Sequence, residues 1–180
     1  MGLLLPLPTE RLTIREFIAP DRARFLTFMT NPTATRWLEF TGEQRTAKGA
    51  SELFDAVMKS YGTTKPIAAY TIADLSDDGF IGSCGYSHCG PGALECYWII
   101  HPDSQGQGYG TEAARALTEG LLAEFNTIEL RAYIHPENAY SRRLAFSIGM
   151  TDRGLGRHPT TGRPGHLFVT SAEDPDAAGA

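Results

Sequence analysis

A glycine-rich run between a strand-like and a helix-like segment constrains this chain more than any other feature. The run reads Gln105-Gly106-Gln107-Gly108-Tyr109-Gly110-Thr111, and it lies between the apolar residues 94–100 and the helical pattern of residues 111–125. Glycine adopts positive φ readily and lets another molecule approach the backbone closely. A helix that begins after such a loop offers unpaired N–H groups and the positive end of its dipole. The run therefore predicts a binding site for a phosphate or pyrophosphate.

The spacing of the run excludes two common phosphate-binding loops. The Walker A motif needs a lysine before its Ser or Thr, whereas Gly110 precedes Thr111 here. The dinucleotide fingerprint G-x-G-x-x-G fails because the glycines alternate. What remains is the pattern Q-x-x-G-x-G, formed by Gln105, Gly108 and Gly110. A glycine-rich turn that only connects a strand to a helix is the alternative interpretation.

The remaining pattern resembles the coenzyme A signature of the GNAT superfamily of N-acetyltransferases, which is written (Gln/Arg)-x-x-Gly-x-(Gly/Ala). Residues 9–15 are similar to the opening strand of its Rim-type branch, the ribosomal-protein N-terminal acetyltransferases and their relatives. Residues 31–38, and the run 135–141 followed by Gly149-Met150, resemble two further segments of that branch. The resemblance covers residues 9–170.

Composition indicates one compact domain over residues 1–170, followed by a small, acidic segment over 171–180 that we expect to be a flexible tail. The chain has 180 residues, of which 42% are hydrophobic and 21% charged, so it is long enough to bury a sizeable core. Its net charge of −5 argues against a broad surface for nucleic acid. Residues 1–8 are apolar but too short for a signal or membrane segment, so we expect a cytoplasmic protein without membrane contact.

The cysteines do not indicate a disulfide framework or a metal site. Cys84, Cys89 and Cys96 form no C-x-x-C pair, which agrees with a reducing compartment. His88 and His101 lie near them in the sequence, but zinc sites usually show tighter, paired spacing. We therefore predict no metal.

Hydrophobic periodicity predicts strands alternating with helices. The expected strands are residues 10–17, 67–75, 80–87, 93–100, 128–134, 150–155 and 165–170, and the expected helices are 21–29, 46–60, 111–125 and 139–148. Short turns at 76–79 and 90–92 favour an antiparallel meander, and residues 156–165 form a loop. The resemblance implies an α/β (α+β) fold. It would be a single GNAT-like domain with a mostly antiparallel, twisted sheet of six to seven strands and about four helices, splayed at the acetyl-CoA site.

The resemblance also implies direct attack of an amine on the thioester of acetyl-CoA. Backbone N–H groups of the glycine-rich run would bind the pyrophosphate, and the pantetheine arm would pair with the splayed end of the preceding strand. The residues expected to bind the cofactor are Ile99, Ile100, Gln105, Gly106, Gln107, Gly108, Tyr109, Gly110, Thr111 and Asn138. One N–H of the same strand would stabilise charge on the thioester oxygen.

Two side chains are expected to carry the acid–base chemistry. Glu95 occupies the position of the family's occasional catalytic glutamate and is the expected base, with a solvent-facing glutamate as the alternative. Ser141 matches the Asn-x-x-Ser element by which Rim-type relatives place a serine near the sulfur, and Tyr140 is the rival acid. Asn138 and Ser141 also fit simple helix capping. Trp37 and Tyr97 are expected to line the substrate pocket.

The resemblance thus implies an acetyl-CoA-dependent N-acetyltransferase that acts on a primary amine, either a protein N-terminus or a small molecule. Two alternatives remain: a sensor that binds acyl-CoA without transferring the group, and transfer through an acylated Cys96. A sensor would need the glycine-rich run and Asn138, but neither Glu95 nor Ser141. A longer acyl group and a homodimer are both open. A protein N-terminus, a polyamine and an aminoglycoside all remain open as acceptors.

Overall fold

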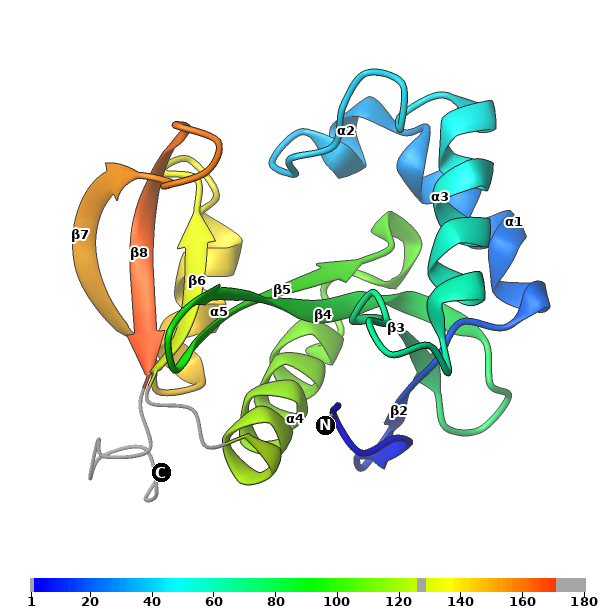
Figure 1. The fold of residues 1–180 in the computed structure, drawn as a ribbon, viewed down its shortest axis with the longest axis horizontal. Coiled ribbons are helices and arrows are strands. Elements are labelled where there is room, and N and C mark those ends of the chain that lie inside the picture. The colour runs from blue at the N-terminus through cyan, green and yellow to red at the C-terminus, as the bar shows by residue number, and fades with distance from the viewer. Residues whose placement is uncertain (1, 126–128, 171–180) are drawn as a thin grey trace.

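One open sheet crosses the molecule in the computed structural model, which describes residues 2–125 and 129–170 (Figure 1). Its order is β1-β2-β3-β4-β5-β6-β8-β7. The strands are β1 (Leu7–Pro8), β2 (Leu12–Arg15), β3 (Ala69–Asp74), β4 (Phe80–Gly90), β5 (Ala93–Ile100), β6 (Glu129–Ile134), β7 (Thr151–Arg157) and β8 (Pro164–Thr170). Neighbouring strands are antiparallel except β5 and β6, which run parallel.

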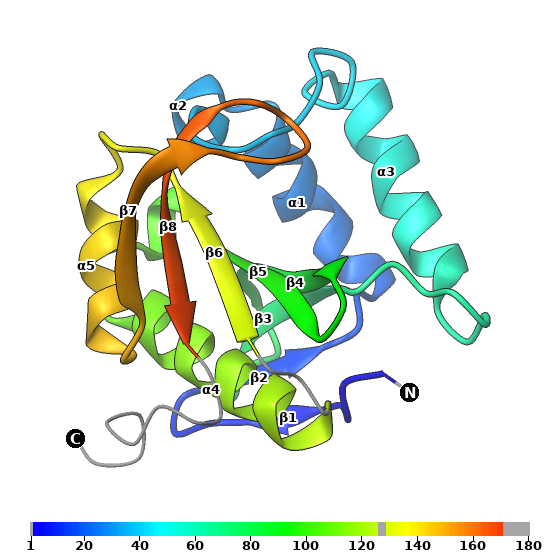
Figure 2. The ribbon, with the colours of Figure 1, turned by 60° about the vertical axis from the view of Figure 1, so that its left-hand side comes forward.

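The helices cover both faces of this sheet. They are α1 (Arg22–Met29), α2 (Pro32–Thr35), α3 (Ala47–Ser60), α4 (Tyr109–Glu124) and α5 (Ala139–Ser147). Figures 1 and 2 show α1 and α3 over one face and α4 against the other, with α5 beside β6 and β8. Ala113, Leu117 and Leu121 are fully buried at four-residue spacing, which gives α4 its apolar stripe against the sheet. No helix in the described ranges is long and apolar enough to cross a membrane.

The predicted fold class is confirmed, and each expected strand and helix is present; β5 has the predicted bounds, whereas the ends of the others are shifted. The sheet has eight strands instead of six to seven, because β1 was not predicted, and α2 is an additional helix. A two-residue strand and a one-turn helix carry no periodicity from which to predict them. The first residue of the expected strand 128–134 and the predicted tail 171–180 lie outside the described residues.

The apolar N-terminal residues belong to the core. Leu3 is buried, and Leu7 packs on the same hydrophobic cluster. A Cβ on Gly120 of α4 would lie only 3.0 Å from Leu7 Cδ1 and 3.1 Å from Leu3 Cδ1. The N-terminal segment therefore packs closely against α4, and a side chain at Gly120 would require these leucines to shift.

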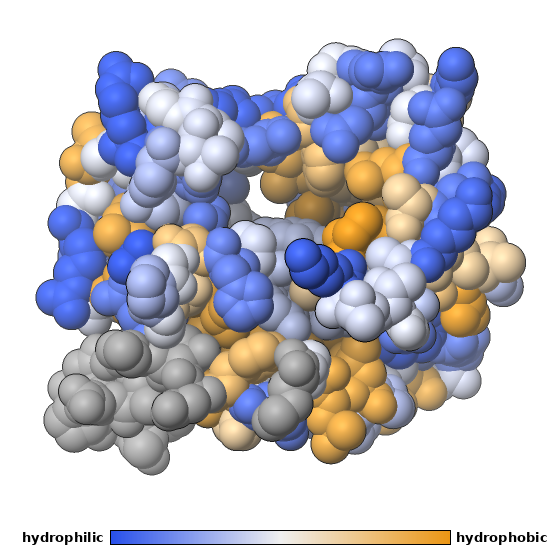
Figure 3. Space-filling view, viewed as in Figure 1, coloured by the Kyte–Doolittle hydropathy of each residue, from blue (hydrophilic) through white to orange (hydrophobic). Residues whose placement is uncertain are grey.

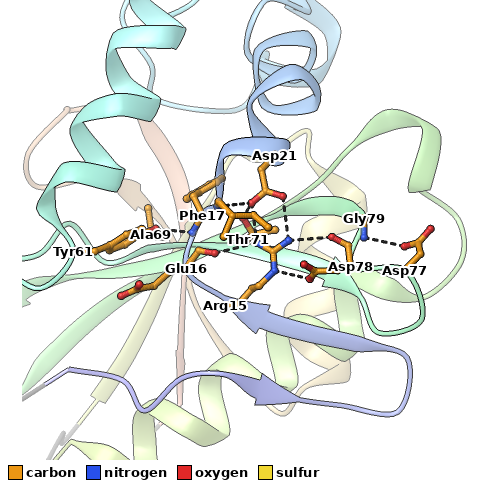
Figure 4. A network of polar contacts seen from close by, with 11 residues as sticks. Arg15, Glu16, Phe17, Asp21, Tyr61, Ala69, Thr71, Asp77, Asp78 and Gly79 are labelled. Carbon is orange, nitrogen blue, oxygen red and sulfur yellow. Dashed lines mark hydrogen bonds and ion pairs between the residues drawn. The ribbon is translucent and has the colours of Figure 1, made fainter.

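A buried ion-pair network attaches the start of α1 to the sheet (Figure 4). The Asp21 carboxylate is 2% exposed and accepts hydrogen bonds from Arg15 Nη1 and Nη2 at 2.8 and 3.1 Å. It also accepts from the Ile18 N–H at 3.0 Å and from the Thr71 hydroxyl at 2.8 Å. Arg15 Nε donates to Asp78 at 2.6 Å. Because a buried carboxylate needs partners, this network fixes where α1 begins.

Tyr61, which directly follows α3, joins the same region from the other side. Its hydroxyl accepts the Phe17 N–H at 3.1 Å and donates to the Ala69 carbonyl at 2.6 Å (Figure 4). Burial raises the pKa of Tyr61 to about 12, so the hydroxyl keeps its proton and can donate. Together the two networks hold α1 and α3 in place over β3 and β4.

The expected splay lies between β5 and β6. Their parallel pairing covers Ala93–Glu95 against Glu129–Arg131 and ends there. β5 stays paired with β4 as far as Ile100, opposite Gly82. From Cys96 onward, β5 and β6 therefore diverge while β5 remains part of the sheet, as Figure 2 shows.

Candidate active site

The splay exposes one backbone edge of β5. The His101 N–H donates to the Ile81 carbonyl at 2.9 Å, and hydrogen-bonded positions alternate along an antiparallel ladder. The backbone groups of the odd-numbered residues therefore face β4, whereas those of Trp98 and Ile100 face the gap. Gln105 Nε2 donates to the Ile100 carbonyl at 3.0 Å from this side. An edge of this kind suits an extended ligand that carries amide groups.

The glycine-rich run has the backbone shape expected of an anion-binding loop. Gly106 and Gly108 have φ of 78° and 81°, in the left-handed region that favours glycine. Gly108 is the N-cap of α4, which begins two residues earlier than predicted. Gly110 is helical, and a Cβ there would lie 3.0 Å from Leu144 Cδ1 and 3.1 Å from the Tyr140 hydroxyl. The third glycine therefore permits close packing against α5.

Arg11 and Glu112 hold the loop against the N-terminal part of the sheet. Arg11 Nη1 donates to the Gln107 carbonyl at 2.9 Å, and its Nη2 lies 2.6 Å from Glu112 Oε2. Glu112 Oε1 accepts from the Thr9 hydroxyl at 2.6 Å and from the Arg11 N–H at 2.8 Å. Burial alone raises the pKa of Glu112, but the hydrogen bonds from Thr9 and Arg11 outweigh it, so this pKa lies below its usual value. Neither Arg11 nor Glu112 was predicted to contribute to the site.

A cavity of about 260 Å³ lies between the loop, the end of β5 and the start of α5. Its lining includes Trp98, Ile99, Ile100, Gln105, Asn138, Tyr140 and Ser141. Asn138 Oδ1 accepts the Ser141 N–H at 3.2 Å, so Asn138 is the N-cap of α5, as predicted. The cavity therefore brings together expected cofactor-binding residues from β5, the loop and α5. The hydroxyls of Tyr140 and Ser141 both belong to residues that line it.

A second cavity of about 390 Å³ lies against the other part of β5, under α1 and α3. Trp37, Leu38 and Ile99 line both cavities and so mark the boundary between them. Figure 3 shows a hollow at the centre of the molecule, with apolar residues gathered on its α3 side. Two cavities that meet along one strand suit a reaction between two bound molecules.

Glu95 lines the larger cavity and has a defined partner. Its side chain is 23% exposed, and its two carboxylate oxygens lie 2.9 and 3.0 Å from His158 Nε2. His158 Nδ1 accepts the backbone N–H groups of Thr160 and Thr161, both at 3.2 Å. Since Nδ1 is an acceptor, the fitting tautomer is neutral imidazole with its hydrogen on Nε2, assigned from this network. Glu95 thus faces a cavity instead of bulk solvent and receives a directed hydrogen bond.

Sequence reasoning missed His158. The residue lies in the segment 156–165 that was predicted as a loop, and a lone histidine there carries no signal. In the structure β7 extends to Arg157 and β8 begins at Pro164, so the loop is shorter than predicted. The hairpin between these strands delivers the imidazole to Glu95, 63 residues away in the sequence.

Tyr97 and Cys96 follow Glu95 on β5 and differ in chemistry. Tyr97 lines the larger cavity, with its hydroxyl 3.4 Å from that of Ser83, and burial raises the pKa of Tyr97 well above its usual value. The Cys96 thiol is buried and donates to the Arg131 carbonyl at 3.3 Å. Burial raises the pKa of Cys96 to about 12. A protonated, buried thiol is a poor nucleophile, which disfavours transfer through an acylated Cys96.

Residues 11–151 match the family model described as the acetyltransferase (GNAT) domain. The chain belongs to the GNAT acetyltransferase family. An uncharacterized N-acetyltransferase of Bacillus subtilis (strain 168), YnaD, is 29% identical over 151 residues, which cover 82% of this chain and 83% of YnaD. This GNAT chain is therefore an acyltransferase.

Two solved structures illustrate how closely the GNAT fold is matched. An acetyltransferase from Agrobacterium tumefaciens str. C58 has a TM-score of 0.73 and 25% identity, covering 93% of this chain and 94% of that one. RimJ of Mycobacterium smegmatis, solved in complex with CoA-disulfide, has a TM-score of 0.71 and 16% identity, and the match covers 91% of this chain and 83% of the RimJ chain. At such low identity, the likeness to RimJ concerns the fold alone.

The predicted site residues of this GNAT chain are only partly brought together by the two cavities. Ile100, Gln105, Asn138 and Ser141 line the smaller cavity, and Glu95 and Tyr97 line the larger one. Residues 106–111 of the glycine-rich run line neither cavity. Trp37 lies between the two cavities, with its ring stacked on that of His135 at a centroid distance of 4.4 Å. No group of three or more His, Cys, Asp or Glu side chains in residues 2–125 and 129–170 is placed to hold a metal ion.

Proposed function

We propose that this protein is an acetyl-CoA-dependent N-acetyltransferase that moves an acetyl group directly to a primary amine. One observation carries the proposal: the Glu95 carboxylate, hydrogen-bonded to His158, lines one cavity, while the open edge of the same strand faces the adjoining cavity at the glycine-rich loop. A donor and an acceptor bound in these cavities would meet along β5. The fold likeness to RimJ and the motifs at residues 9–15 and 135–141 support a place near the Rim-type branch.

The glycine-rich run and the smaller cavity beside it would together bind acetyl-CoA, with the pyrophosphate at the run and the arm in the cavity. Gly106 and Gly108, with their positive φ angles, precede α4 and leave backbone N–H groups available for a pyrophosphate. The Thr111 hydroxyl follows in the first turn of α4. The gap-facing groups of Trp98 and Ile100, and the Asn138 side chain, would hold the amide-bearing arm. When bound, acetyl-CoA supplies the acetyl group as a thioester, so transfer forms a C–N bond and breaks a C–S bond. The CoA-disulfide bound to RimJ supports this choice of ligand.

Glu95 would remove the proton that the attacking amine must lose. An ammonium group has no lone pair with which to attack a carbonyl, so a base at the end of the acceptor cavity is required. The hydrogen bond from His158 Nε2 fixes the orientation of the carboxylate. His158 is therefore a positioning residue, because its Nε2 faces Glu95 and its Nδ1 is occupied by the loop backbone.

The start of α5 would supply the proton for the departing thiolate. Ser141 and Tyr140 both line the donor cavity. The Tyr140 hydroxyl lies near Gly110, where a Cβ would be 3.1 Å away, so it points toward the loop that would bind the pyrophosphate. We assign the proton to Ser141 for this reason. The backbone N–H of Trp98 faces the gap and would stabilise the charge that develops on the thioester oxygen.

Calorimetric titration with acetyl-CoA, followed by a thiol-release assay in the same preparation, tests the proposal. We expect saturable binding, and thiol release that depends on an added primary amine. Glu95→Gln should bind acetyl-CoA normally and release thiol about 100-fold more slowly. Binding without release on any amine would contradict the transferase and favour a sensor of acyl-CoA, and absence of binding would overturn the assignment of the loop.

A further inference from the structure

The larger cavity has an apolar interior at one end. Six of its lining residues there are Phe17, Phe25, Phe28, Met29, Val57 and Phe80, each less than a tenth exposed. Protein cores are close-packed and seldom contain voids much larger than a water molecule. At about 390 Å³, this cavity instead falls in the size range of small-molecule sites. An apolar space of this size suits an apolar ligand group.

Packing keeps the apolar end from collapsing. The ring centroids of Phe17 and Phe25 lie 5.4 Å apart, and those of Phe17 and Phe54 also lie 5.4 Å apart, both pairs edge to face. The Arg15–Asp21 network fixes the start of α1, which carries Phe25. The rings are therefore held in place by one another and by a buried ion pair, so the space is built into the fold.

Polar groups line the opposite end of the same cavity. Glu95 and His158 lie on the side of β6 and the β7–β8 loop, whereas α1 and α3 cover the side of β3 and β4 (Figure 1). The cavity therefore runs from a carboxylate at one end to a cluster of phenylalanines at the other. A ligand that spans it would place a cationic or amine group at Glu95 and an apolar group under α1 and α3.

The β7–β8 loop also touches the segment between α2 and α3. The Thr161 hydroxyl donates to Glu39 Oε1 at 2.8 Å, and Arg163 Nη1 donates to the Leu38 carbonyl at 3.2 Å. Leu38, Glu39 and Arg163 all line the larger cavity. These contacts join the two segments along the wall of the cavity, and its volume of about 390 Å³ limits the apolar group of a ligand to a compact one.

We propose that the acceptor is a primary amine attached to a compact, bulky apolar group, either aromatic or branched aliphatic. Its amine binds at Glu95 and its apolar group lies between Phe25, Phe28 and Val57. This inference rests on the proposed transferase function and specifies its substrate class. A polyamine or an aminoglycoside would place charged or hydroxyl groups against phenylalanine rings, where they find no hydrogen-bond partners. A small apolar amine and a peptide whose first residue has a bulky apolar side chain share the required chemistry.

The test compares thiol release at saturating acetyl-CoA for matched acceptors. The small amines are 2-phenylethylamine, 3-methylbutylamine, ethanolamine and spermidine, and the peptides differ only in a first residue of Phe, Leu or Ser. We expect kcat/KM to be at least about tenfold higher for the two apolar amines, or for the Phe and Leu peptides, than for their polar counterparts. The arm with the higher kcat/KM distinguishes a free amine from a peptide N-terminus.

A cavity variant provides a second readout. Leu53 lines the cavity from α3, and Leu53→Asn changes its polarity while keeping the number and branching of its side-chain heavy atoms. We expect KM for the apolar amine to rise about tenfold while binding of acetyl-CoA, which also reports folding, stays unchanged. Leu155→Asn on β7, at a residue 64% exposed, is the control and should leave both values unchanged.

The outcomes separate the two proposals. Turnover that is highest with ethanolamine or spermidine, or equal across the panel, would overturn the apolar acceptor and leave the transferase standing. An unchanged KM in Leu53→Asn would likewise overturn the placement of the apolar group. Thiol release with no member of the panel, despite bound acetyl-CoA, would overturn the transferase and the acceptor class together.

Discussion

The Nε2 atom of His158 lies 2.9 and 3.0 Å from the two carboxylate oxygens of Glu95. The glutamate belongs to β5 near the middle of the sheet, and the histidine belongs to the hairpin loop at its far edge. The backbone N–H groups of Thr160 and Thr161 donate to His158 Nδ1. This leaves the ring hydrogen on Nε2, from which it is donated to the carboxylate. Orientation of the proposed base therefore depends on a loop that is distant in the sequence.

Replacement of His158 should affect catalysis without affecting binding of the donor. We expect His158→Ala to lower kcat about tenfold, because Glu95 loses its hydrogen-bond donor, and to leave KM for acetyl-CoA unchanged. His158→Gln, whose side-chain amide can still donate, should retain more activity than His158→Ala. Steady-state kinetics with varied acetyl-CoA measure both constants.

The control for this series is His88→Ala, at an exposed histidine on β4 that does not line the cavity. In a Glu95→Gln background, His158→Ala should cause little further loss, because the two residues act as a unit. Fully additive losses in the double variant would show that His158 does not act through Glu95.

The two hydroxyls at the start of α5 should be separable. Ser141→Ala is expected to lower kcat about tenfold with nearly normal calorimetric binding of acetyl-CoA, because a leaving group loses its proton donor. Tyr140→Phe should keep kcat and weaken binding if its hydroxyl acts at the loop near Gly110. The reverse pattern would transfer the proton-donor role to Tyr140.

A side chain at the N-cap of α4 should abolish binding of acetyl-CoA. Gly108 has φ of 81°, so Gly108→Val adds backbone strain of about 1–2 kcal/mol and places a branched side chain at the loop. Gly62→Val is a matched control, because Gly62 has φ of 74° and open space around it, away from the loop. Calorimetry should show binding lost in the first variant and kept in the second. Equal loss in both would assign the effect to strain.

The Asp21 network should dominate the stability of the α1 region. Asp21 is 2% exposed, and Asp21→Asn would remove the buried carboxylate from Arg15, whose side chain is 14% exposed and would keep only the exposed Asp78 as an ionic partner. We expect the free energy of unfolding in urea to fall by about 3 kcal/mol. The exposed pair of Arg22 and Asp55 provides the comparison, and Asp55→Asn should cost much less, because water screens that pair. Similar losses in both variants would contradict the importance of burial.

Glu112 should make stability depend on pH. Its pKa in the folded protein lies below the usual value of 4.5, so its contribution to stability is present above that value and is lost as the pH falls through the lowered pKa. Glu112→Gln should therefore be less stable than wild type at neutral pH, and the difference should shrink as the pH falls below 4.5. Thermal unfolding of both proteins from neutral to acidic pH measures this difference in stability. A difference that is constant with pH would contradict the assignment.

Local patterns in the sequence were sufficient to predict α4 and its glycine loop. Ala114, Leu117, Leu121 and Phe125 repeat at 3–4 spacing, and the alternating glycines mark the loop before them. Both features depend on residues that are close in the sequence. The splay of β5 was expected only from the resemblance to the family, because it arises from pairing with β6, more than 30 residues further along the chain.

The partner of Glu95 and the shape of the acceptor cavity could not be predicted in this way. His158 reaches Glu95 only through the register of the β7–β8 hairpin, which nothing in the loop sequence specifies. Phe25 and Phe28 read as ordinary core residues, and only the packing of α1 over the sheet shows that they line a cavity. Both features arise from contacts between segments far apart in the chain.

Mass spectrometry of 2-phenylethylamine after incubation with the protein and acetyl-CoA tests the central claim most directly. We predict that the N-acetylated amine forms in step with released CoA thiol, and that Glu95→Gln forms it about 100-fold more slowly. Thiol release at the same rate with and without amine, with no acetylated product from this or any other amine, would contradict transfer to an amine.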